Sequence, residues 1–349
     1  MTTAQPIPAQ PIPAPPGSPD AAVPWHYGDP HAEQRALDAG RGAVDLSHRE
    51  VLGVTGPDRL RWLHDLTTAH LSELAPGTSR LALILSPHGH VEHELHVVDD
   101  ATTTWITVEP GTGAAVRAYL DSVRFLLRVE VTERPDLAVV WEPRHGADDE
   151  GRPTWLVPDD FAGTGITPAG TDAGGGADRY VPNRPGLLVG REVLVPRSEL
   201  AARMADAGPA AGTWALEALR VAAAVPRLGF ETDHRTLPHE VGWIGPGVHL
   251  AKGCYRGQEA VARVHNLGRP PRRLGLAHLD GSAGILPAHG DVVRIGERPV
   301  GWVATPARHH ELGPIATVVL KRSADPQADL QIDTGDGVVV ASQQVVVVP

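Results

Sequence analysis

The chain has a single cysteine, Cys254, among its 349 residues. One cysteine cannot form an intramolecular disulfide, and a lone thiol is expected to stay reduced in a cytosolic setting. Iron–sulfur clusters are usually held by four protein thiolates or by a mixture of thiolates and histidines. The sequence therefore excludes a disulfide scaffold and an ordinary cluster-holding protein.

Basic charge and long apolar runs are also scarce. The formal net charge is -11, which disfavours an extended nucleic-acid surface because such a surface needs basic residues to neutralise phosphates. No apolar run approaches the roughly 20 residues of a spanning helix, and the N-terminus lacks the basic and apolar regions of a secretory signal. We therefore expect a cytoplasmic protein with neither nucleic acid nor membrane as a partner.

The first residues are rich in proline. Ala-Gln-Pro-Ile-Pro occurs twice, at residues 4–8 and 9–13, and Pro15, Pro16 and Pro19 follow. Such a run favours extended polyproline geometry over packing. It predicts a disordered tail over residues 1–22, and we prefer a solvated spacer to an SH3-type ligand.

Beyond the tail the chain has the length and ordinary composition of two or three globular domains. Residues 23–274 mix strand and helix patterns, with a divide between two subdomains near residues 135–180. From residue 275 to 349 short Val-rich strands alternate with Gly and Pro turns, which is typical of a small barrel or sandwich. The sequence thus predicts an α+β fold with a C-terminal β-barrel.

A β-hairpin is predicted from the buried-strand pattern at residues 81–85, the turn Ser-Pro-His-Gly and the apolar residues of 91–98. This stretch also holds four histidines, of which His88, His90 and His96 share one face with Glu94 in an extended chain. A zinc site is one interpretation. Adjacent positions on one strand face seldom converge on a metal, so we prefer a solvated or cleft-lining polar face and expect no metal site.

The densest chemistry lies in the octapeptide Lys-Gly-Cys-Tyr-Arg-Gly-Gln-Glu, residues 252–259. Lys252 and Arg256 lie two residues to either side of Cys254, and nearby cations lower the pKa of a thiol. After the second glycine come good helix formers with Glu259 in the first turn, which predicts a Gly-bounded turn opening a helix. From these residues alone, a reactive thiolate and a small buried hydrophobe both remain open.

This octapeptide resembles the Lys-Gly-Cys-Tyr-x-Gly-Gln-Glu signature of the YgfZ family, folate-binding proteins related to the aminomethyltransferase (T-protein) of the glycine cleavage system. Further resemblance to these proteins lies in four stretches, residues 44–47, 54–58, 219–229 and 237–240. The resemblance implies an aminomethyltransferase-like multi-domain ring of ferredoxin-like, antiparallel-sheet subdomains with the C-terminal barrel. It also implies tetrahydrofolate as cofactor and iron–sulfur client proteins or assembly machinery as partners.

The same resemblance implies a set of site residues. Cys254 and Lys252 are the expected catalytic pair. The expected cofactor-binding residues are Glu94, Arg220, Tyr255, Glu259 and Arg263. Tyr255 could stack on a flat ring, and the arginines could serve a polyglutamate tail.

One position departs from the related transferases. Their pterin-binding Glu, in an Arg-x-Glu-Ala-Gly stretch, aligns with Ala222. Three alternatives follow: another acid substitutes, the pterin is held loosely, or the cleft binds another ligand. The candidate acids are Glu94, Glu231 and Asp233, and Glu94 falls where the transferases place a catalytic Asp.

Three functions are compatible with these residues. The leading hypothesis is a tetrahydrofolate-binding accessory protein for the synthesis or repair of iron–sulfur enzymes, with Cys254 as the functional thiol. The second is a tetrahydrofolate-dependent aminomethyltransferase or demethylase. The third is a client-docking module without chemistry of its own, in which the thiol is structural.

Overall fold

The computed structural model describes residues 10–148, 150–158, 188–282 and 284–347, and every structural statement below refers to these ranges. The expected subdomain divide near 135–180 therefore lies partly outside them. None of the helices in these ranges combines the length and hydropathy needed to cross a bilayer.

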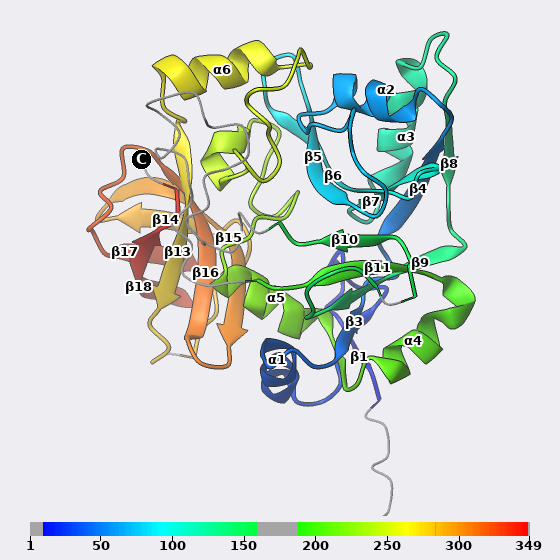
Figure 1. Ribbon diagram of the computed structural model, residues 1–349. Coiled ribbons are helices and arrows are strands. Elements are labelled where there is room, and N and C mark those ends of the chain that lie inside the picture. The colour runs from blue at the N-terminus through cyan, green and yellow to red at the C-terminus, as the bar shows by residue number, and fades with distance from the viewer. Residues whose placement is uncertain (1–9, 149, 159–187, 283, 348–349) are drawn as a thin grey trace, which may run out of the picture.

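Two open five-stranded sheets and a closed barrel build the fold (Figure 1). The first sheet has the order β5 (Ser79–Leu85), β6 (Val91–Asp99), β7 (Thr103–Val108), β4 (Glu50–Thr55) and β8 (Glu130–Glu133). The second has the order β10 (Thr154–Leu156), β11 (Arg191–Pro196), β9 (Leu137–Glu142), β3 (Ala43–Asp45) and β12 (Ala210–Ala211). The barrel closes in the order β13 (Arg272–Leu279), β16 (Gly313–Lys321), β15 (Arg298–His309), β14 (Val292–Ile295), β17 (Leu330–Thr334) and β18 (Gly337–Val345).

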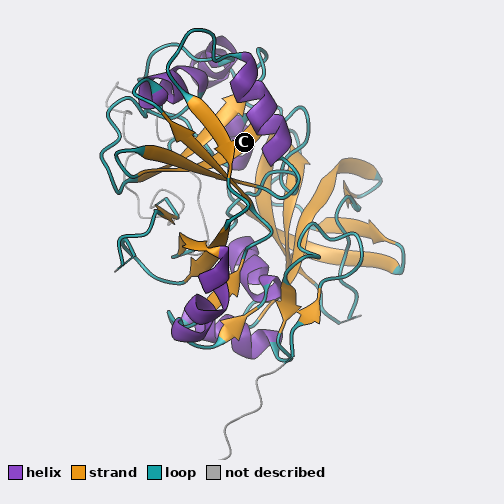
Figure 2. Ribbon diagram, turned by 90° about the vertical axis from the view of Figure 1, so that its right-hand side faces the viewer, coloured by secondary structure: helices purple, strands orange, loops and turns teal. Residues whose placement is uncertain are grey.

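Six α-helices of the described ranges cover these sheets. They are α1 (Pro30–Asp38), α2 (Arg59–Leu66), α3 (Gly113–Ser122), α4 (Leu200–Asp206), α5 (Thr213–Ala222) and α6 (Gln258–Leu267). Figure 2 shows one sheet with its helices above the other, and the barrel beside both. The prediction of an α+β fold with antiparallel sheets and a C-terminal barrel is confirmed.

The β5 strand explains how the two sheets come together. Its side chains alternate between faces, as in any strand. Leu81, Leu83 and Leu85 enter the core shared with the second sheet, whereas Ala82 and Ile84 enter the core under α2 and α3. A strand buried on both faces reads as a continuous apolar run. The predicted hairpin is confirmed, because β5 pairs with β6 in antiparallel register.

The second anchor of the fold is α5, which lies against the barrel. Leu216 and Leu219 face the core between the sheets, while Ala218 and Ala222 pack with barrel residues such as Leu276. Small residues on that face let the helix approach the barrel closely. Ala222 therefore has a packing role, and no carboxylate stands at this position.

The prediction of a disordered tail over residues 1–22 is wrong for residues 10–22, whereas residues 1–9 lie outside the described ranges. Strand β1 (Ile12–Pro13) pairs with β2 (Pro24–His26), and Trp25 stacks on Trp214 with ring centroids 5.9 Å apart. Asp20 is only 3% exposed. Proline content hid this segment's anchors, which are an aromatic pair and a buried carboxylate.

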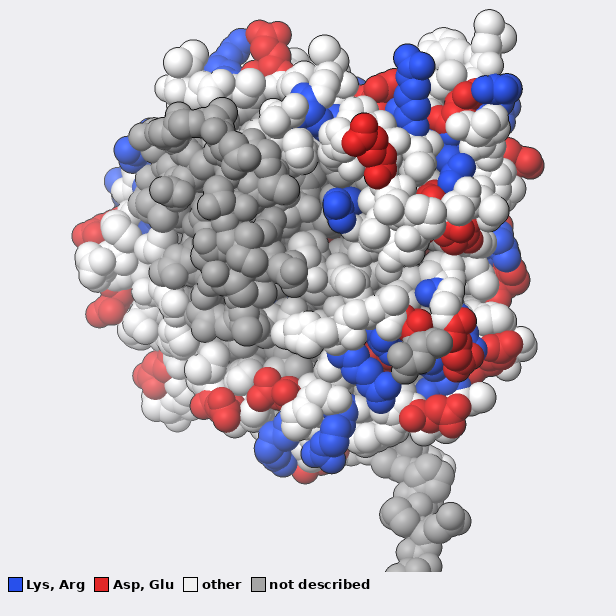
Figure 3. Space-filling view, in the orientation of Figure 1, with Lys and Arg blue, Asp and Glu red and all other residues white. Residues whose placement is uncertain are grey.

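Charge on the visible surface is mixed. On the face shown in Figure 3, acidic and basic side chains are interspersed, and a group of both signs lies near α4. There Arg203 pairs with Asp148 at 2.7 Å, and Arg152 pairs with Glu199 at 3.0 Å. Among the described residues of this face we see no broad basic patch.

Candidate functional site

Three cavities border the β5–β6 hairpin. The central cavity, of about 60 Å³, sits where β6, β11 and α5 meet. Its charged lining residues are Arg49, Glu94, His96, Glu109, Glu192, Glu217, Arg220 and Arg227. This volume lies well below the range of about 300–1,000 Å³ typical of small-molecule sites.

The large cavity, of about 950 Å³, lies between β6, residues 228–234 and His289 of the barrel. Gly17 and Pro19 of the N-terminal segment close another side. Glu109 lines both the large and the central cavity. The volume of the large cavity falls within the range of about 300–1,000 Å³ typical of small-molecule sites.

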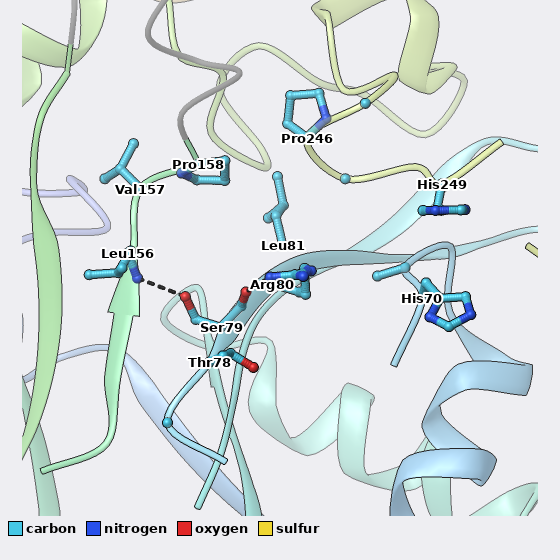
Figure 4. A pocket seen from close by; sticks show the side chains of 14 residues that line it. His70, Thr78, Ser79, Arg80, Leu81, Leu156, Val157, Pro158, Pro246 and His249 are labelled. Atoms are coloured by element: carbon cyan, nitrogen blue, oxygen red, sulfur yellow. Dashed lines mark hydrogen bonds between the residues drawn. The ribbon is translucent and has the colours of Figure 1, made fainter. Parts of the chain in front are cut away.

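The third cavity, of about 400 Å³, is shown in Figure 4. It lies between the start of β5, the end of β10 and the loop around Pro246, with His70 and His249 at one side. Leu156 donates its backbone N–H to Ser79 across this cavity at 3.0 Å. Its described lining includes no carboxylate and none of the predicted site residues.

Glu94 and His96 point from β6 into the central cavity, as the shared face predicted. His96 Nδ1 lies 2.9 Å from Glu192 Oε2, and His96 Nε2 lies 3.6 Å from Glu94 Oε1. The imidazole stacks on Trp155 with ring centroids 3.6 Å apart. Burial opposes protonation of His96, but Glu192 and Glu94 outweigh it and raise its pKa to about 9.

Glu109 and Arg49 form the opposite wall. Arg49 bonds Glu109 and Glu192, each at 2.8 Å, and Arg227 Nε bonds the other oxygen of Glu109 at 2.8 Å. Burial alone would raise the pKa of Glu109, yet Arg227 and Arg49 lower it to about 2. Buried charges are tolerated only when paired in this way.

Of the three acids that might replace the missing pterin ligand, Glu231 is already saturated. A carboxylate has about four acceptor sites. Thr305 and Thr317 donate to Glu231 Oε1, each at 2.6 Å. Arg220 at 3.0 Å and the backbone N–H of Arg227 at 2.8 Å donate to Oε2.

Asp233 is equally occupied. It accepts from two nitrogens of Arg272, at 2.7 and 3.0 Å, from Thr236 Oγ1 at 3.0 Å and from the backbone N–H of Arg235 at 2.9 Å. Glu94 differs. Its described hydrogen bond is the one it accepts from the Leu228 backbone N–H at 3.0 Å, so its carboxylate keeps acceptor capacity toward the cavity.

Arg220 lines the central cavity, but its donors are taken. It bonds both oxygens of Glu217 at 2.8 and 2.9 Å, the Val225 carbonyl at 2.6 Å and Thr305 at 3.0 Å, besides Glu231. Burial alone would lower the pKa of Arg220, but Glu217 and Glu231 raise it. The structure therefore gives Arg220 the role of tying α5 to the barrel, and leaves few donors for a ligand.

The octapeptide lies apart from this charged cavity. Cys254 is exposed, so a small buried hydrophobe is not what the structure shows. Lys252 is buried at 5% exposure, and its ammonium donates to the carbonyls of His64 and Thr67 at the end of α2. Arg256 pairs with Glu92 at 3.0 Å. Both flanking cations are thus engaged with groups other than the thiol.

Lys252 acts as a cationic cap for α2. A cation is favourable at a helix C-terminus because the last carbonyls lack intrahelical partners. Burial lowers the pKa of Lys252 to about 8, so the ammonium still predominates at neutral pH. The structure thus gives Lys252 a capping contact at α2, and its catalytic role stays a prediction.

Tyr255 belongs to the core between the two sheets, 8% exposed. Burial raises the pKa of its phenol to about 12, and the ammonium of Lys252 lies 5.0 Å from the ring centroid. The ring therefore packs inside the protein and is not free to stack on a ligand.

The glycines of the octapeptide serve close packing. Gly257 has φ +82°, a left-handed conformation, and a Cβ there would come within 2.5 Å of the Ser86 carbonyl. On the facing turn, a Cβ on Gly89 would meet Ala260 at 2.9 Å. The predicted helix does open after Gly257 as α6, pressed against the β5–β6 turn.

Glu259 and Arg263 lie on the outer face of α6. Their side chains are 91% and 71% exposed and pair with each other at 3.3 Å. The structure does not bring them together with Glu94. Of the predicted residues, Glu94 and Arg220 share the central cavity, while Cys254, Lys252 and Tyr255 share the octapeptide loop.

Sequence reasoning missed several buried charged residues, of which Arg227 and Glu192 line the central cavity. Arg227 lies inside one of the stretches that carry the family resemblance, but the sequence indicates no role for it. Glu192 and Arg191 were visible as two charges opening an otherwise apolar strand, a sign of buried pairing. Asp20 was hidden by the proline-rich composition around it.

The arrangement defines a class of protein: two α+β sheet domains and a closed C-terminal barrel around a central cavity, which is the aminomethyltransferase fold. Residues 21–139 match the GCVT N-terminal domain. The crystal structure of glycine cleavage system aminomethyltransferase T from Bartonella henselae superposes with a TM-score of 0.70 at 16% identity, covering 92% of this chain and 90% of that one.

Curated aminomethyltransferases are similar in sequence. That of Herpetosiphon aurantiacus is 26% identical over 324 residues, 89% of this chain and 87% of that protein. That of Nitrosococcus oceani is 33% identical over 120 residues, 34% of this chain and 32% of that protein. The chain is thus similar to aminomethyltransferases over most of its length.

We expect Lys252→Met to lower the free energy of unfolding by about 1–3 kcal/mol, because two carbonyls at the end of α2 lose their donor. The rate of Cys254 alkylation by iodoacetamide at pH 7.5 should change less than about twofold, since the ammonium is engaged elsewhere. Urea unfolding and alkylation kinetics measure the two effects. A large fall in alkylation rate at unchanged stability would show instead that Lys252 activates the thiol.

His96 should make stability depend on pH. Its pKa is raised in the fold to about 9 from an unfolded value of about 6.5, so its contribution is complete below pH 6.5 and is lost as pH rises through 9. By linkage, the wild type should lose about 2–4 kcal/mol of unfolding free energy over this window relative to His96→Gln. Urea unfolding from pH 6 to 9.5 tests this, and parallel curves for the two proteins would contradict it.

Proposed function

We propose that this protein binds tetrahydrofolate across the central and large cavities, with Glu94 holding the edge of the pterin. The observation that carries the proposal is the unfilled acceptor capacity of Glu94, in contrast to the saturated Glu231 and Asp233. A pterin edge presents adjacent N–H donors that suit a carboxylate.

The fit of folate has a steric side as well as a chemical one. The central cavity offers the Glu94 carboxylate but has a volume of only about 60 Å³, whereas the large cavity has a volume of about 950 Å³. Glu109 lines both, and Leu228 lines the large cavity while its backbone N–H bonds Glu94. Residues 228–234 and the barrel would hold the remainder of the ligand.

For the reaction we propose one-carbon transfer of the aminomethyl type. Tetrahydrofolate supplies the acceptor for the one-carbon unit when bound. The protein's own part would be to hold the ring through Glu94 and to exclude water from the central cavity with Trp155 and the ion pairs around it. Support comes from the aminomethyltransferases to which the chain is similar.

A second function is favoured by a different observation. Cys254 is exposed within the octapeptide that resembles the YgfZ signature. We propose on this basis that the chain belongs to the YgfZ branch and assists the synthesis or repair of iron–sulfur enzymes through this thiol. No other cysteine exists in the chain, so a partner chain or small thiol must complete any exchange at Cys254.

Folate binding is tested by titration with 5-formyltetrahydrofolate, followed by calorimetry. Glu94→Gln should weaken binding about tenfold to a hundredfold, because a charge-assisted hydrogen bond to the pterin is lost. Glu73→Gln, which alters an exposed carboxylate outside the cavities, is the matched control. Absence of binding by the wild type, or equal affinities of the two variants, would refute the proposal.

The accessory role is tested in a strain that lacks this protein. Wild type and Glu73→Gln should restore iron–sulfur enzyme activities, and Cys254→Ala should restore less than about a tenth of them if the thiol carries the function. Complete restoration by Cys254→Ala would exclude the thiol. Formation of methylenetetrahydrofolate from an aminomethyl donor by that same variant would then favour the transferase.

A further inference from the structure

The N-terminal strap, defined here as residues 14–23, lies between the two cavities of the proposed folate site. Gly17 and Pro19 line the large cavity. The next residue, Asp20, binds Arg227 with both carboxylate oxygens, at 2.7 and 3.1 Å, and accepts from His48 at 2.8 Å. Arg227 itself lines the central cavity. The strap thus reaches from the wall of one cavity to a cation of the other.

Asp20 is the polar tether of the strap. The backbone hydrogen bonds of this segment are internal: Ser18 to Pro15, Ala21 to Ser18 and Val23 to Asp20, at 3.1 to 3.2 Å. Among the described hydrogen bonds and ion pairs of the strap, those to the rest of the chain come from the Asp20 carboxylate. Ala14 and Val23 at its ends are also buried, but a turn whose outward polar contacts come from one side chain can be displaced without breaking a sheet.

The position of Asp20 is built for a carboxylate. Arg227 presents two nitrogens in a fork, which matches the geometry of a carboxylate. Burial alone would raise the pKa of Asp20, but His48 and Arg227 hold it well below its usual range. The remaining partners of Arg227, namely Glu109 at 2.8 Å and Glu217 at 3.4 Å, do not move with the strap.

The volumes give an independent reason to expect displacement. The central cavity holds Glu94, whose carboxylate keeps acceptor sites free, but its volume of about 60 Å³ is far smaller than that of the large cavity. The large cavity has the room of a ligand site but is walled on one side by the strap. Removing Gly17, Pro19 and Asp20 from their places would open the wall of the large cavity and expose Arg227.

We infer that Asp20 occupies a carboxylate-binding site formed by Arg227 and His48, and that a glutamate carboxylate of the ligand takes its place when the strap is displaced. This inference rests on the proposed folate binding. The exchange conserves charge, since one carboxylate replaces another on the same guanidinium. Asp20 therefore acts as an internal competitor that selects ligands carrying a carboxylate able to displace it.

The test compares two probes on three proteins by calorimetry. The probes are 5-formyltetrahydrofolate, which carries a glutamate, and 6-methyltetrahydropterin, which does not. The proteins are the wild type, Asp20→Asn and the control Asp206→Asn, which changes an exposed carboxylate at the end of α4. Asp20→Asn should raise the ratio of folate to pterin affinity about tenfold, because the neutral amide competes less well for Arg227 and only folate brings a carboxylate to it.

A second measurement uses the wild type alone, and so does not depend on how the variant folds. Amide hydrogen exchange of residues 14–23 should become faster when the protein is saturated with 5-formyltetrahydrofolate, and remain unchanged with 6-methyltetrahydropterin. Unchanged or slower exchange with folate overturns the inference.

The outcomes separate the two proposals. If the wild type and Asp20→Asn show the same ratio of folate to pterin affinity, Asp20 forms a structural ion pair. The inference is then overturned, while folate binding stands. If no protein binds either probe, the proposed folate site is wrong and the inference fails with it. A raised ratio together with faster exchange of the strap supports both.

Discussion

The buried ion pairs around Arg227 hold the parts of this molecule in their relative positions. Arg227 follows α5, and its guanidinium reaches Glu109 beside the first sheet and Asp20 of the N-terminal segment. Its backbone N–H reaches Glu231, which in turn bonds two barrel threonines. Removing one partner would leave a charge buried and uncompensated, which is far costlier than losing a surface pair. The network therefore specifies one arrangement of the sheets and the barrel.

This constraint also creates the candidate site. Side chains that must stay paired cannot collapse into an apolar core, so a small polar cavity remains among them. Most of its charges neutralise one another. Glu94 lies 3.6 Å from His96, but its position at the cavity wall still leaves acceptor sites free. The same network that stabilises the fold thus isolates one carboxylate for a ligand, beside a larger space that could hold one.

The octapeptide contributes to the molecule in another way. Its lysine caps α2, its tyrosine fills the core between the sheets, and its second glycine allows contact with the β5–β6 turn. These three roles are structural, and together they hold Cys254 at the surface. The residue types of this motif suggest a catalytic cluster, but three of them make structural contacts that place one exposed thiol at the surface.

The sequence by itself determined the fold class, the barrel, the β5–β6 hairpin and the helix after Gly257, because these depend on local patterns of apolar residues and glycines. It also indicated Glu94, through its place on one strand face with His96. Only the tertiary structure decided which charges meet. Glu231 and Asp233 were alternatives to Glu94, and the structure shows that partners, some of them far along the chain, occupy their acceptor sites as they occupy the donors of Arg220. The partners of Lys252 and Asp20 were hidden for the same reason, since the pairing of a buried charge depends on distant segments that no local pattern reveals.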